Sequence, residues 1–301
     1  MSPPRPLPAV VKAALGALVS VVLLGASEVL LRVAGVPDPG LYEGDPAWLW
    51  FLRPDLDRDV DGPTGRFHVR TNADGLRGVG PPESGAWTLV LGCSTTFGWG
   101  VEGQEAWPAQ LSDRLGEVVV NGGVPGWSTV QAVRGAGRWL DAGPDRVVLA
   151  YGVRDAWPSA RPDAAAHRTH PLLSSHLGRL VRGLIDPRPT GAAPTAVPPE
   201  TGIWRVSPED FADNIRQLVA RSGDAEVHLL WFPQQTEREA WRQALEDVGP
   251  VIAPRFMRTD FLPDDPVHLT AAGHDKLAAT VAEAINAEAG PARTGTPPAQ
   301  R

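Results

Sequence analysis

Short aliphatic runs alternate with helical patterns through the middle of this 301-residue chain. The runs are rich in Val and Leu and lie at 87–91, 117–121, 145–151 and 226–232. Such nearly continuous apolar runs are typical of strands buried on both faces of a sheet. Helical patterns lie at 107–115, 130–140, 208–221 and 271–287. Strands that alternate with helices predict an α/β protein with a parallel sheet covered by helices on both faces. We expect its active site at the carboxyl ends of the strands.

Residues 13–27 form an uncharged run of mostly Ala, Val, Leu and Gly between Lys12 and Glu28. If the Lys12 side chain extends out of the apolar region, the run reaches back to Pro8 and attains the roughly 20 residues that a bilayer core requires. The run is apolar on all sides, which disfavours a helix buried in a soluble domain. We therefore expect a transmembrane helix that anchors the protein.

A cleaved signal peptide is the alternative for this segment, because its apolar region is shorter than a membrane span. Cleavage after Ala26 would place Leu24 where a small residue is preferred, which favours the uncleaved anchor. Arg5 and Lys12 precede the run and Arg32 follows it. This bias favours a cytoplasmic amino terminus with the rest of the chain outside, in the periplasm or at the cell surface.

The sequence divides into four parts. We expect the anchor at 1–33, a lead-in segment packed on the domain at 34–85, the α/β domain at 86–288, and a disordered tail rich in Pro, Ala and Thr at 289–301. Within the domain, residues 186–202 carry five prolines and few large apolar residues. This stretch is too long for a tight turn, so we expect a flexible excursion.

Charge and cysteine content exclude several kinds of function. The chain has 28 Lys and Arg against 35 Asp and Glu, a net charge of −7 that does not favour nucleic acid as a partner. The single cysteine, Cys93, cannot form a disulfide within the chain or supply a zinc site of several cysteines, and we expect it to be buried. His167 and His170 lack an evident third ligand. We expect neither a metal nor an organic cofactor.

A serine directly follows the first predicted strand. Residues 92–98 are Gly-Cys-Ser-Thr-Thr-Phe-Gly, and a serine held where a strand turns into a loop or helix is well placed to be an exposed nucleophile. Thr96 stands where the nucleophile elbow of α/β-hydrolases requires glycine, so Ser94 does not belong to that class. Taken alone, the segment is explained equally well as a turn of small residues.

A serine nucleophile needs a base, and one histidine stands out. His268 has a carboxylate, Asp265, three residues before it, and an aspartate at that distance can hold the ring in the right tautomer. The remaining histidines have no acid at this offset: His68, His167, His170, His176, His228 and His274.

Three segments together resemble the SGNH, or GDSL-like, hydrolases. Residues 92–101 resemble the family's first block, with Cys93 in place of the usual Asp. The second block is matched by residues 121–129, Asn-Gly-Gly-Val-Pro-Gly-Trp-Ser-Thr. The last block is matched by residues 265–274, Asp-Pro-Val-His-Leu-Thr-Ala-Ala-Gly-His. The resemblance extends over residues 86–288. It implies a flavodoxin-like three-layer α/β/α sandwich and serine ester chemistry, and several members of the family carry an amino-terminal membrane helix.

The resemblance also implies roles for individual residues. Ser94 is then the nucleophile, His268 the base and Asp265 the acid that orients it. The backbone amides of Ser94 and Gly126 form the oxyanion hole, and the acyl group passes to water or to another alcohol.

The third block departs from the family pattern. The family's Gly-x-Asn-Asp has its Asn where this sequence has Arg154. That Asn normally donates a hydrogen bond to the oxyanion, and one such donor is worth ~10²–10³ in rate. Arg154 is either a substitute donor, a clamp for an anionic group of the substrate, a partner of Asp155, or a sign of lost activity.

Three tryptophans follow the predicted site segments closely: Trp99, Trp127 and Trp157. Aromatic rings there could form a platform for a sugar or the wall of an acyl pocket, although ordinary core or loop packing is a slightly better explanation for each ring taken separately. With the outside location, they favour an acylated carbohydrate, such as an O-acylated polysaccharide, as the substrate. Residues 72–77, Asn-Ala-Asp-Gly-Leu-Arg, are typical of a structural turn.

We therefore expect a membrane-anchored serine esterase that acts outside the cytoplasm. Two alternatives stay open. One is an acyltransferase that works with membrane machinery in polysaccharide decoration, and the other is a binding module in which Arg154 marks reduced catalysis.

Overall fold

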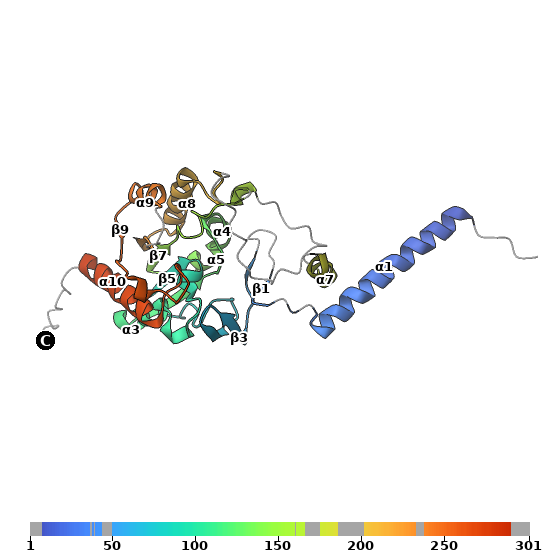
Figure 1. Ribbon diagram of the computed structural model, residues 1–301, viewed down its shortest axis with the longest axis horizontal. Helices are drawn as coiled ribbons and strands as arrows, with labels where there is room; N and C mark the ends of the chain where they lie inside the picture. The colour runs from blue at the N-terminus through green and yellow to red at the C-terminus, as the bar shows by residue number, and fades with distance from the viewer. Residues whose placement is uncertain are drawn as a thin grey trace, which may run out of the picture.

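Five parallel strands form the central sheet (Figure 1). They are β5 (Trp87–Gly92), β6 (Val118–Gly123), β7 (Arg146–Ala150), β8 (Glu226–Leu230) and β9 (Val251–Ile252). Their order across the sheet is β6-β5-β7-β8-β9, which is the flavodoxin-like order. Gly92 pairs with Gly123 on one side and Ala150 on the other, so the carboxyl ends of β5, β6 and β7 lie at one edge.

The computed structural model describes residues 8–36, 38, 40–43, 50–159, 161–165, 175–185, 202–232 and 238–289. Most of the predicted Pro-rich excursion, the carboxyl-terminal tail, His167 and His170 lie outside these residues.

Helices cover both faces of the sheet, which makes the three-layer α/β/α arrangement predicted from the sequence. One face is covered by α3 (Trp107–Leu115) and α10 (Ala271–Ala289), the other by α4 (Thr129–Gly135), α5 (Gly137–Leu140), α8 (Pro208–Arg221) and α9 (Glu239–Glu246). Each side has its own hydrophobic core, and the strand residues alternate between the two cores. The cores therefore fix the sheet between two helical layers.

Helix starts follow from local sequence. At α8, Ser207 Oγ accepts a hydrogen bond from the Asp210 amide, and Pro208 occupies the first helical position. At α10, the Thr270 hydroxyl accepts a hydrogen bond from the Gly273 amide. Thr270 therefore caps the helix that follows His268.

A lead-in region precedes the sheet and packs on its carboxyl edge. It contains β1 (Tyr42–Glu43), β2 (Phe51–Leu52), and a hairpin of β3 (Asp57–Gly62) and β4 (Gly65–Arg70). Phe67 and Val69 of the hairpin and Leu52 form a third small core with Phe97. Because Phe97 lies three residues after Ser94, this region supports the segment that carries the predicted nucleophile.

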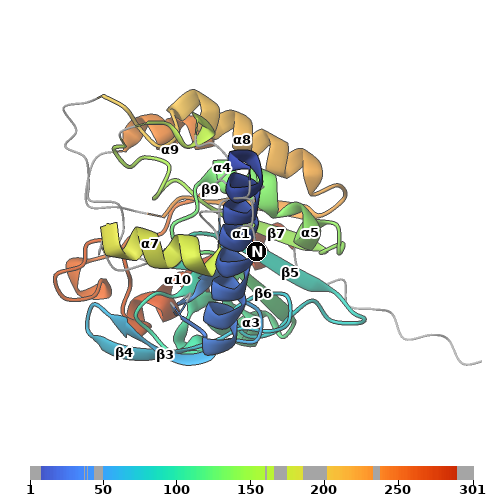
Figure 2. The same ribbon diagram turned by 90° about the vertical axis from the view of Figure 1, so that its right-hand side faces the viewer.

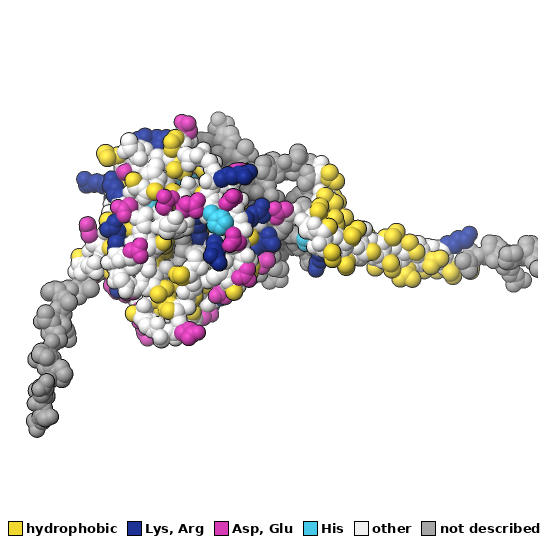
Figure 3. Space-filling model, turned by 90° about the horizontal axis from the view of Figure 1, so that it is seen from below, with side chains coloured by type: hydrophobic (Ala, Val, Ile, Leu, Met, Phe, Trp, Pro, Cys, Tyr) yellow, Lys and Arg dark blue, Asp and Glu magenta, His cyan; other side chains and the backbone are white. Residues whose placement is uncertain are grey.

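Helix α1 (Ala9–Ala34) projects away from the domain (Figures 1 and 2). Of the described helices it alone is long and apolar enough to cross a membrane, with a mean hydropathy of 2.2 over its best 18-residue window and none of that window buried. Its surface is almost continuously hydrophobic (Figure 3). The helix therefore meets the requirements of a membrane anchor or a signal sequence, by length and composition.

The end of α1 contacts α7 (His176–Ile185), a short helix outside the sheet layers. Both carboxylate oxygens of Glu28 accept hydrogen bonds from the first amides of α7, those of His176 and Leu177. A carboxylate at a helix amino terminus satisfies amides that have no partner inside the helix. This contact joins the apolar helix to the rest of the chain.

The structure corrects three details of the predicted secondary structure. The helix predicted at 130–140 is interrupted at Ala136, where α4 ends and α5 begins one residue later. The helix α9 and the edge strand β9 were not predicted. β9 has two residues, which is too short to give a recognisable strand pattern, and α9 has eight.

Candidate active site

Ser94, His268 and Asp265 lie together at the carboxyl edge of the sheet. Ser94 Oγ is 2.8 Å from His268 Nε2, and His268 Nδ1 is 2.7 Å from Asp265 Oδ2. The side chains of His268 and Asp265 are 12% and 15% exposed, and Ser94 is buried. The residues that the sequence selected as nucleophile, base and orienting acid therefore form one hydrogen-bonded chain, although Ser94 and His268 are 174 positions apart in the sequence.

Asp265 is held as a carboxylate. Burial alone would raise its pKa, but the hydrogen bond and charge of His268, together with the backbone amides of His268 and Val267, lower the pKa of Asp265 to about 2. Those two amides donate to Oδ1 at 3.0 and 2.8 Å, so the carboxylate is fixed in position while Oδ2 remains for the ring. A fixed carboxylate on Nδ1 leaves Nε2 as the proton acceptor that faces Ser94.

Ser94 is the first residue of a single helical turn, α2 (Ser94–Phe97), directly after β5. The turn closes at Gly98, whose φ of 83° is a left-handed conformation that glycine adopts without strain. Below it, Cys93 is buried as expected. The strand end and the turn together fix the position of the Ser94 hydroxyl.

Arg77 secures the loop that follows Ser94. Its guanidinium is buried and donates hydrogen bonds to the carbonyl oxygens of Phe97, Gly98, Val101 and His68. Arg77 ends the segment 72–77, which forms the predicted turn through hydrogen bonds to Asn72. Sequence analysis identified the turn but missed the arginine, because nothing local shows that its side chain reaches a loop 20 positions away.

Two backbone amides are available to stabilise an oxyanion. Among the residues that the structure describes, neither the Ser94 amide nor the Gly126 amide has a hydrogen-bond acceptor. The loop that holds Gly126 is joined to β5 by the hydrogen bond from the Val124 amide to the Gly92 carbonyl oxygen, 3.0 Å long. Free amides near a nucleophile are the usual components of an oxyanion hole.

Trp50 forms a wall beside Gly126. Gly126 has a φ of 87°, a conformation that favours glycine, and a Cβ there would lie 3.1 Å from the Trp50 ring, which is a tight contact. Trp50 Nε1 donates to the Pro125 carbonyl oxygen, and Trp127 Nε1 donates to the Trp50 carbonyl oxygen. Trp50 lies in the lead-in region, and its role could not be inferred from spacing.

The loop after β7 is fixed by Asp155. This buried carboxylate accepts hydrogen bonds from the Thr129 amide and hydroxyl at 2.8 and 2.6 Å and from the Gly152 amide at 3.1 Å. Burial raises the pKa of Asp155, whereas these hydrogen bonds act to lower it. Its oxygens are therefore engaged by the loop and by α4. The suggested pairing of Arg154 with Asp155 is not found, because Arg154 forms no ion pair with any residue in the described part of the chain.

Arg154 itself is buried, with 8% of its surface exposed. Its guanidinium carbon lies 4.0 Å from the centre of the Trp157 ring, a close cation–π contact. Burial is the main cause that lowers the pKa of Arg154, and the charge of Asp265 acts in the opposite direction. Arg154 therefore lies close enough to the catalytic carboxylate for the two charges to interact.

The three candidate tryptophans occupy different surroundings. Trp157 supports Arg154, and Trp99 packs edge-on against Phe67 with ring centres 5.3 Å apart. Trp127 is fully buried and stacks on Trp139 at 6.0 Å. Trp127 therefore has no free face for a sugar, and its surroundings are those of a core residue.

His274 lies near the site but is engaged in packing. Its ring is fully buried, and Nδ1 accepts the Trp107 amide hydrogen bond at 3.3 Å. Burial, followed by the charges of Arg77 and His268, lowers the pKa of His274 to about 3. His274 therefore stays neutral and joins α10 to α3.

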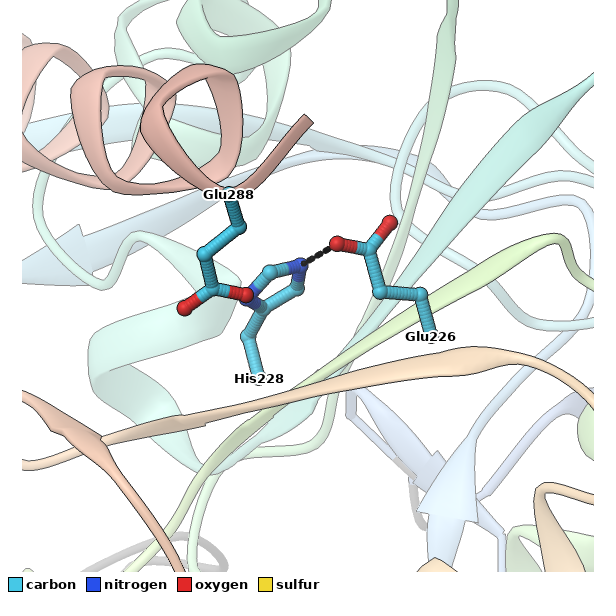
Figure 4. Close-up of side chains that lie close together, drawn as sticks. All are labelled: Glu226, His228 and Glu288. Atoms are coloured by element: carbon cyan, nitrogen blue, oxygen red, sulfur yellow. Dashed lines mark ion pairs between the residues drawn. The ribbon is translucent and has the colours of Figure 1, made fainter. Parts of the chain in front are cut away.

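One further cluster could be considered as a metal site: Glu226, His228 and Glu288 at the amino end of β8 (Figure 4). His228 Nε2 lies 3.2 Å from Glu226, and Nδ1 lies 3.4 Å from Glu288. A histidine binds a metal through one nitrogen, whereas here the two carboxylates face different nitrogens. Burial lowers the pKa of His228, which favours the neutral ring, so we interpret the cluster as a polar contact that Arg146 joins by its ion pair with Glu226.

The comparisons with known proteins agree with this geometry. The family model for GDSL-like lipases and acylhydrolases matches residues 90–276, which is more than half of the chain. The chain belongs to this family. The family predicted from the three sequence segments is confirmed, and the protein is a hydrolase of the SGNH, or GDSL-like, type. A comparison with curated protein sequences finds no match.

Several solved structures are similar to the chain. The esterase EstA from Pseudoalteromonas is 16% identical, with a TM-score of 0.42 over 67% of this chain and 100% of its own. An acetylxylan esterase from Geobacillus stearothermophilus is 16% identical, with a TM-score of 0.41 over 68% and 94%. A carbohydrate esterase of family 2 from Corynascus thermopiles, with its carbohydrate-binding domain, is 14% identical, with a TM-score of 0.43 over 76% and 74%.

Proposed function

We propose that this GDSL-like hydrolase is a serine esterase in which Ser94, His268 and Asp265 form the catalytic triad. The observation that carries the proposal is the hydrogen-bonded chain from Ser94 Oγ through His268 to Asp265, with distances of 2.8 and 2.7 Å. A serine hydroxyl is a weak nucleophile unless a base takes its proton, and this chain supplies the base and the acid that orients it.

The reaction begins with attack by Ser94 Oγ on the ester carbonyl carbon. His268 Nε2 takes the hydroxyl proton as the new C–O bond forms, and Asp265 stabilises the resulting imidazolium. The same proton then passes from His268 to the leaving alcohol, which leaves an acyl group on Ser94. A water molecule gives a proton to His268 as it attacks the acyl-enzyme, and His268 then returns that proton to Ser94 Oγ as the bond to the acyl group breaks and the acid leaves.

The negative charge on the tetrahedral intermediate is stabilised by the amides of Ser94 and Gly126. Both amides lack an acceptor among the described residues, so no existing hydrogen bond has to break when the oxyanion forms. Donors that are fixed before the reaction stabilise the transition state without reorganisation. Arg154 stands at the sequence position of the family's third donor, and in this proposal the two amides alone carry the oxyanion.

The protein acts outside the cytoplasm, held at the membrane by α1, on an acylated substrate such as an O-acylated polysaccharide. The length and hydropathy of α1 support the anchor. Trp157 and Trp99 lie in the two loops next to the site and leave part of their surface exposed, which supports a carbohydrate-bearing substrate.

Turnover of neutral 4-nitrophenyl esters by the purified protein tests the esterase proposal. We expect the wild type to hydrolyse them and Ser94→Ala to be inactive, because the variant cannot form the acyl-enzyme. Ser222→Ala is the matched control, since its hydroxyl contacts only the α8 carbonyl of Leu218 among the described residues. If Ser94→Ala retains the wild-type rate, the proposal is wrong.

Deletion of residues 1–33 tests the anchor. We expect the full-length chain to sediment with membranes, and the shortened chain to be soluble and folded. Recovery of the full-length product in the salt-washed soluble fraction, without its first 26 residues, would show that the segment is a cleaved signal peptide.

A further inference from the structure

Arg154 is a buried cation without an acidic partner. Its side chain is 8% exposed, and Nε has no hydrogen-bond acceptor. In the described part of the chain, none of its nitrogens donates a hydrogen bond or pairs with a carboxylate. Its one close contact of note is the Trp157 ring. Buried charges in proteins are normally paired, so this arrangement requires an explanation.

The nearby acids are already engaged. Asp265 is bound to His268, and Asp155 to Thr129 and Gly152. A third acid, Asp163, forms a two-pronged ion pair with Arg205, whose nearest contact is 2.7 Å. Arg205 in turn adds positive charge near Arg154. Each of these acids therefore has other partners, and in the described part of the chain none of them forms an ion pair with Arg154.

Tyr42 is a neutral polar group in the wider surroundings of Arg154. Its phenol lies near enough for the charge of Arg154 to act on it, and burial raises the pKa of Tyr42, so the hydroxyl keeps its proton. Among the described residues this hydroxyl has no hydrogen-bond partner. A guanidinium without an acceptor suits an oxyanion, which has several lone pairs to offer.

We propose that Arg154 binds an anionic group of the substrate, a carboxylate or a phosphate, beside the ester that Ser94 attacks. This inference rests on the proposed esterase function and narrows its substrate to anionic esters. The Trp157 ring holds the plane of the guanidinium, and the fork of its terminal nitrogens binds two oxygens of the anion at once. Arg154 is thus a specificity-determining residue in place of the family's asparagine.

Binding of simple anions tests the site without requiring turnover. Isothermal titration of the full-length protein in detergent uses succinate and inorganic phosphate as probes. We expect saturable binding of at least one of them by the wild type, loss of that binding in Arg154→Gln, and retention in Arg216→Gln, an exposed arginine on α8 paired with Asp213. The probe that binds with the higher affinity identifies the preferred anion.

A conservative variant separates the contribution of the two-pronged guanidinium geometry from that of the positive charge. Arg154→Lys keeps a cation but loses the two-pronged geometry, so we expect weaker binding than in the wild type and stronger binding than in Arg154→Gln. If Arg154→Gln does not fold, the comparison between Arg154→Lys and the wild type still measures the contribution of the fork. Absence of saturable binding in the wild type, or equal binding in all variants, would overturn the proposal.

Ester selectivity gives a second test. The neutral ester is 4-nitrophenyl acetate; 4-nitrophenyl hydrogen succinate carries the anion on the acyl side, and 4-acetoxybenzoate carries it on the alcohol side. We expect Arg154→Gln to lose about 10–100-fold in kcat/KM on the preferred anionic ester, the range expected for a charge-assisted hydrogen bond, and little on the neutral one. An equal loss on all esters would contradict anion recognition.

These outcomes separate the two proposals. If the wild type binds anions but hydrolyses none of the esters, the esterase proposal fails while the anion site stands. If it hydrolyses neutral esters by Ser94 and shows no anion binding or preference, the esterase stands and the anion site fails.

Discussion

The protein holds a histidine beside carboxylates at each end of its central sheet, and only one of the two clusters includes a nucleophile. At the carboxyl edge, His268 contacts Asp265 through Nδ1 and Ser94 through Nε2. At the amino edge, both nitrogens of His228 face carboxylates, those of Glu226 and Glu288. In the first arrangement the ring contacts a hydroxyl from which it can take a proton, whereas in the second the described residues offer the ring no hydroxyl.

The two ends also differ in how completely their charges are paired. At the amino end, Arg146 pairs with Glu117 and with Glu226. At the carboxyl end, Arg154 has no acid partner among the described residues, although it is buried. A histidine next to a carboxylate is thus a poor sign of function by itself. The identity of the group on its other nitrogen, and an uncompensated charge nearby, are more informative.

The largest expected effect distinguishes the two histidines by their contribution to ester turnover. We expect His268→Ala to lower kcat on neutral esters by roughly 10⁴–10⁶-fold, as removal of the base does in other serine hydrolases. His228→Ala should hydrolyse the same esters at the wild-type rate, because its ring lies at the opposite end of the sheet from Ser94. An inactive His228→Ala together with an active His268→Ala would show that the wrong cluster was selected.

The second prediction concerns Arg154→Asn, which restores the family's residue. If Arg154 binds substrate anions or acts as a substitute oxyanion donor, turnover of neutral esters stays similar or rises modestly. Initial rates on 4-nitrophenyl acetate measure this. A gain of about 10²–10³-fold from an undetectable rate, which is what a missing oxyanion donor is worth, would show that the natural site is impaired and favour a binding module.

The smallest effect involves a third histidine, His274, which faces no acid. The pKa of this buried ring is lowered from 6.5 to about 3, so between these values the unfolded chain binds a proton that the folded chain does not. As the pH is lowered through this range, the free energy of unfolding therefore falls by about 1.4 kcal/mol per pH unit from this one group. Denaturant unfolding from about pH 6 to about pH 4 measures the slope.

His274→Asn is the matched variant for that measurement, since an amide oxygen can still accept the Trp107 amide hydrogen bond. We expect its stability to fall less steeply on acidification than that of the wild type, while ester turnover is retained. Equal slopes in the two proteins would contradict a neutral His274 in the folded state.

The sequence predicted those features that depend on local pattern. The first four strands of the sheet were visible as apolar runs, and α3 and α8 were predicted at the bounds that the structure has. Ser94 was found because it follows a strand, and His268 because Asp265 lies three residues before it. In each case the information lies within a few consecutive residues, which is the range over which backbone conformation and side-chain reach are determined.

Features that depend on distant contacts were not predicted. Arg77 contacts carbonyl oxygens 20 to 24 positions away, and Trp50 contacts a loop 75 positions away. Trp127 was a candidate for substrate binding because it follows Gly126, but the fold turns its ring into the core. Sequence spacing places the backbone of a residue at the site edge and does not determine which way its side chain points.

The central claim is that Ser94 is a nucleophile activated by His268. The most direct measurement is covalent labelling of the purified protein by a fluorophosphonate probe, followed by mass mapping of the modified peptide. The account predicts one adduct on Ser94, absent in Ser94→Ala and strongly slowed in His268→Ala. An unlabelled wild type, or a label that persists in Ser94→Ala, would contradict it.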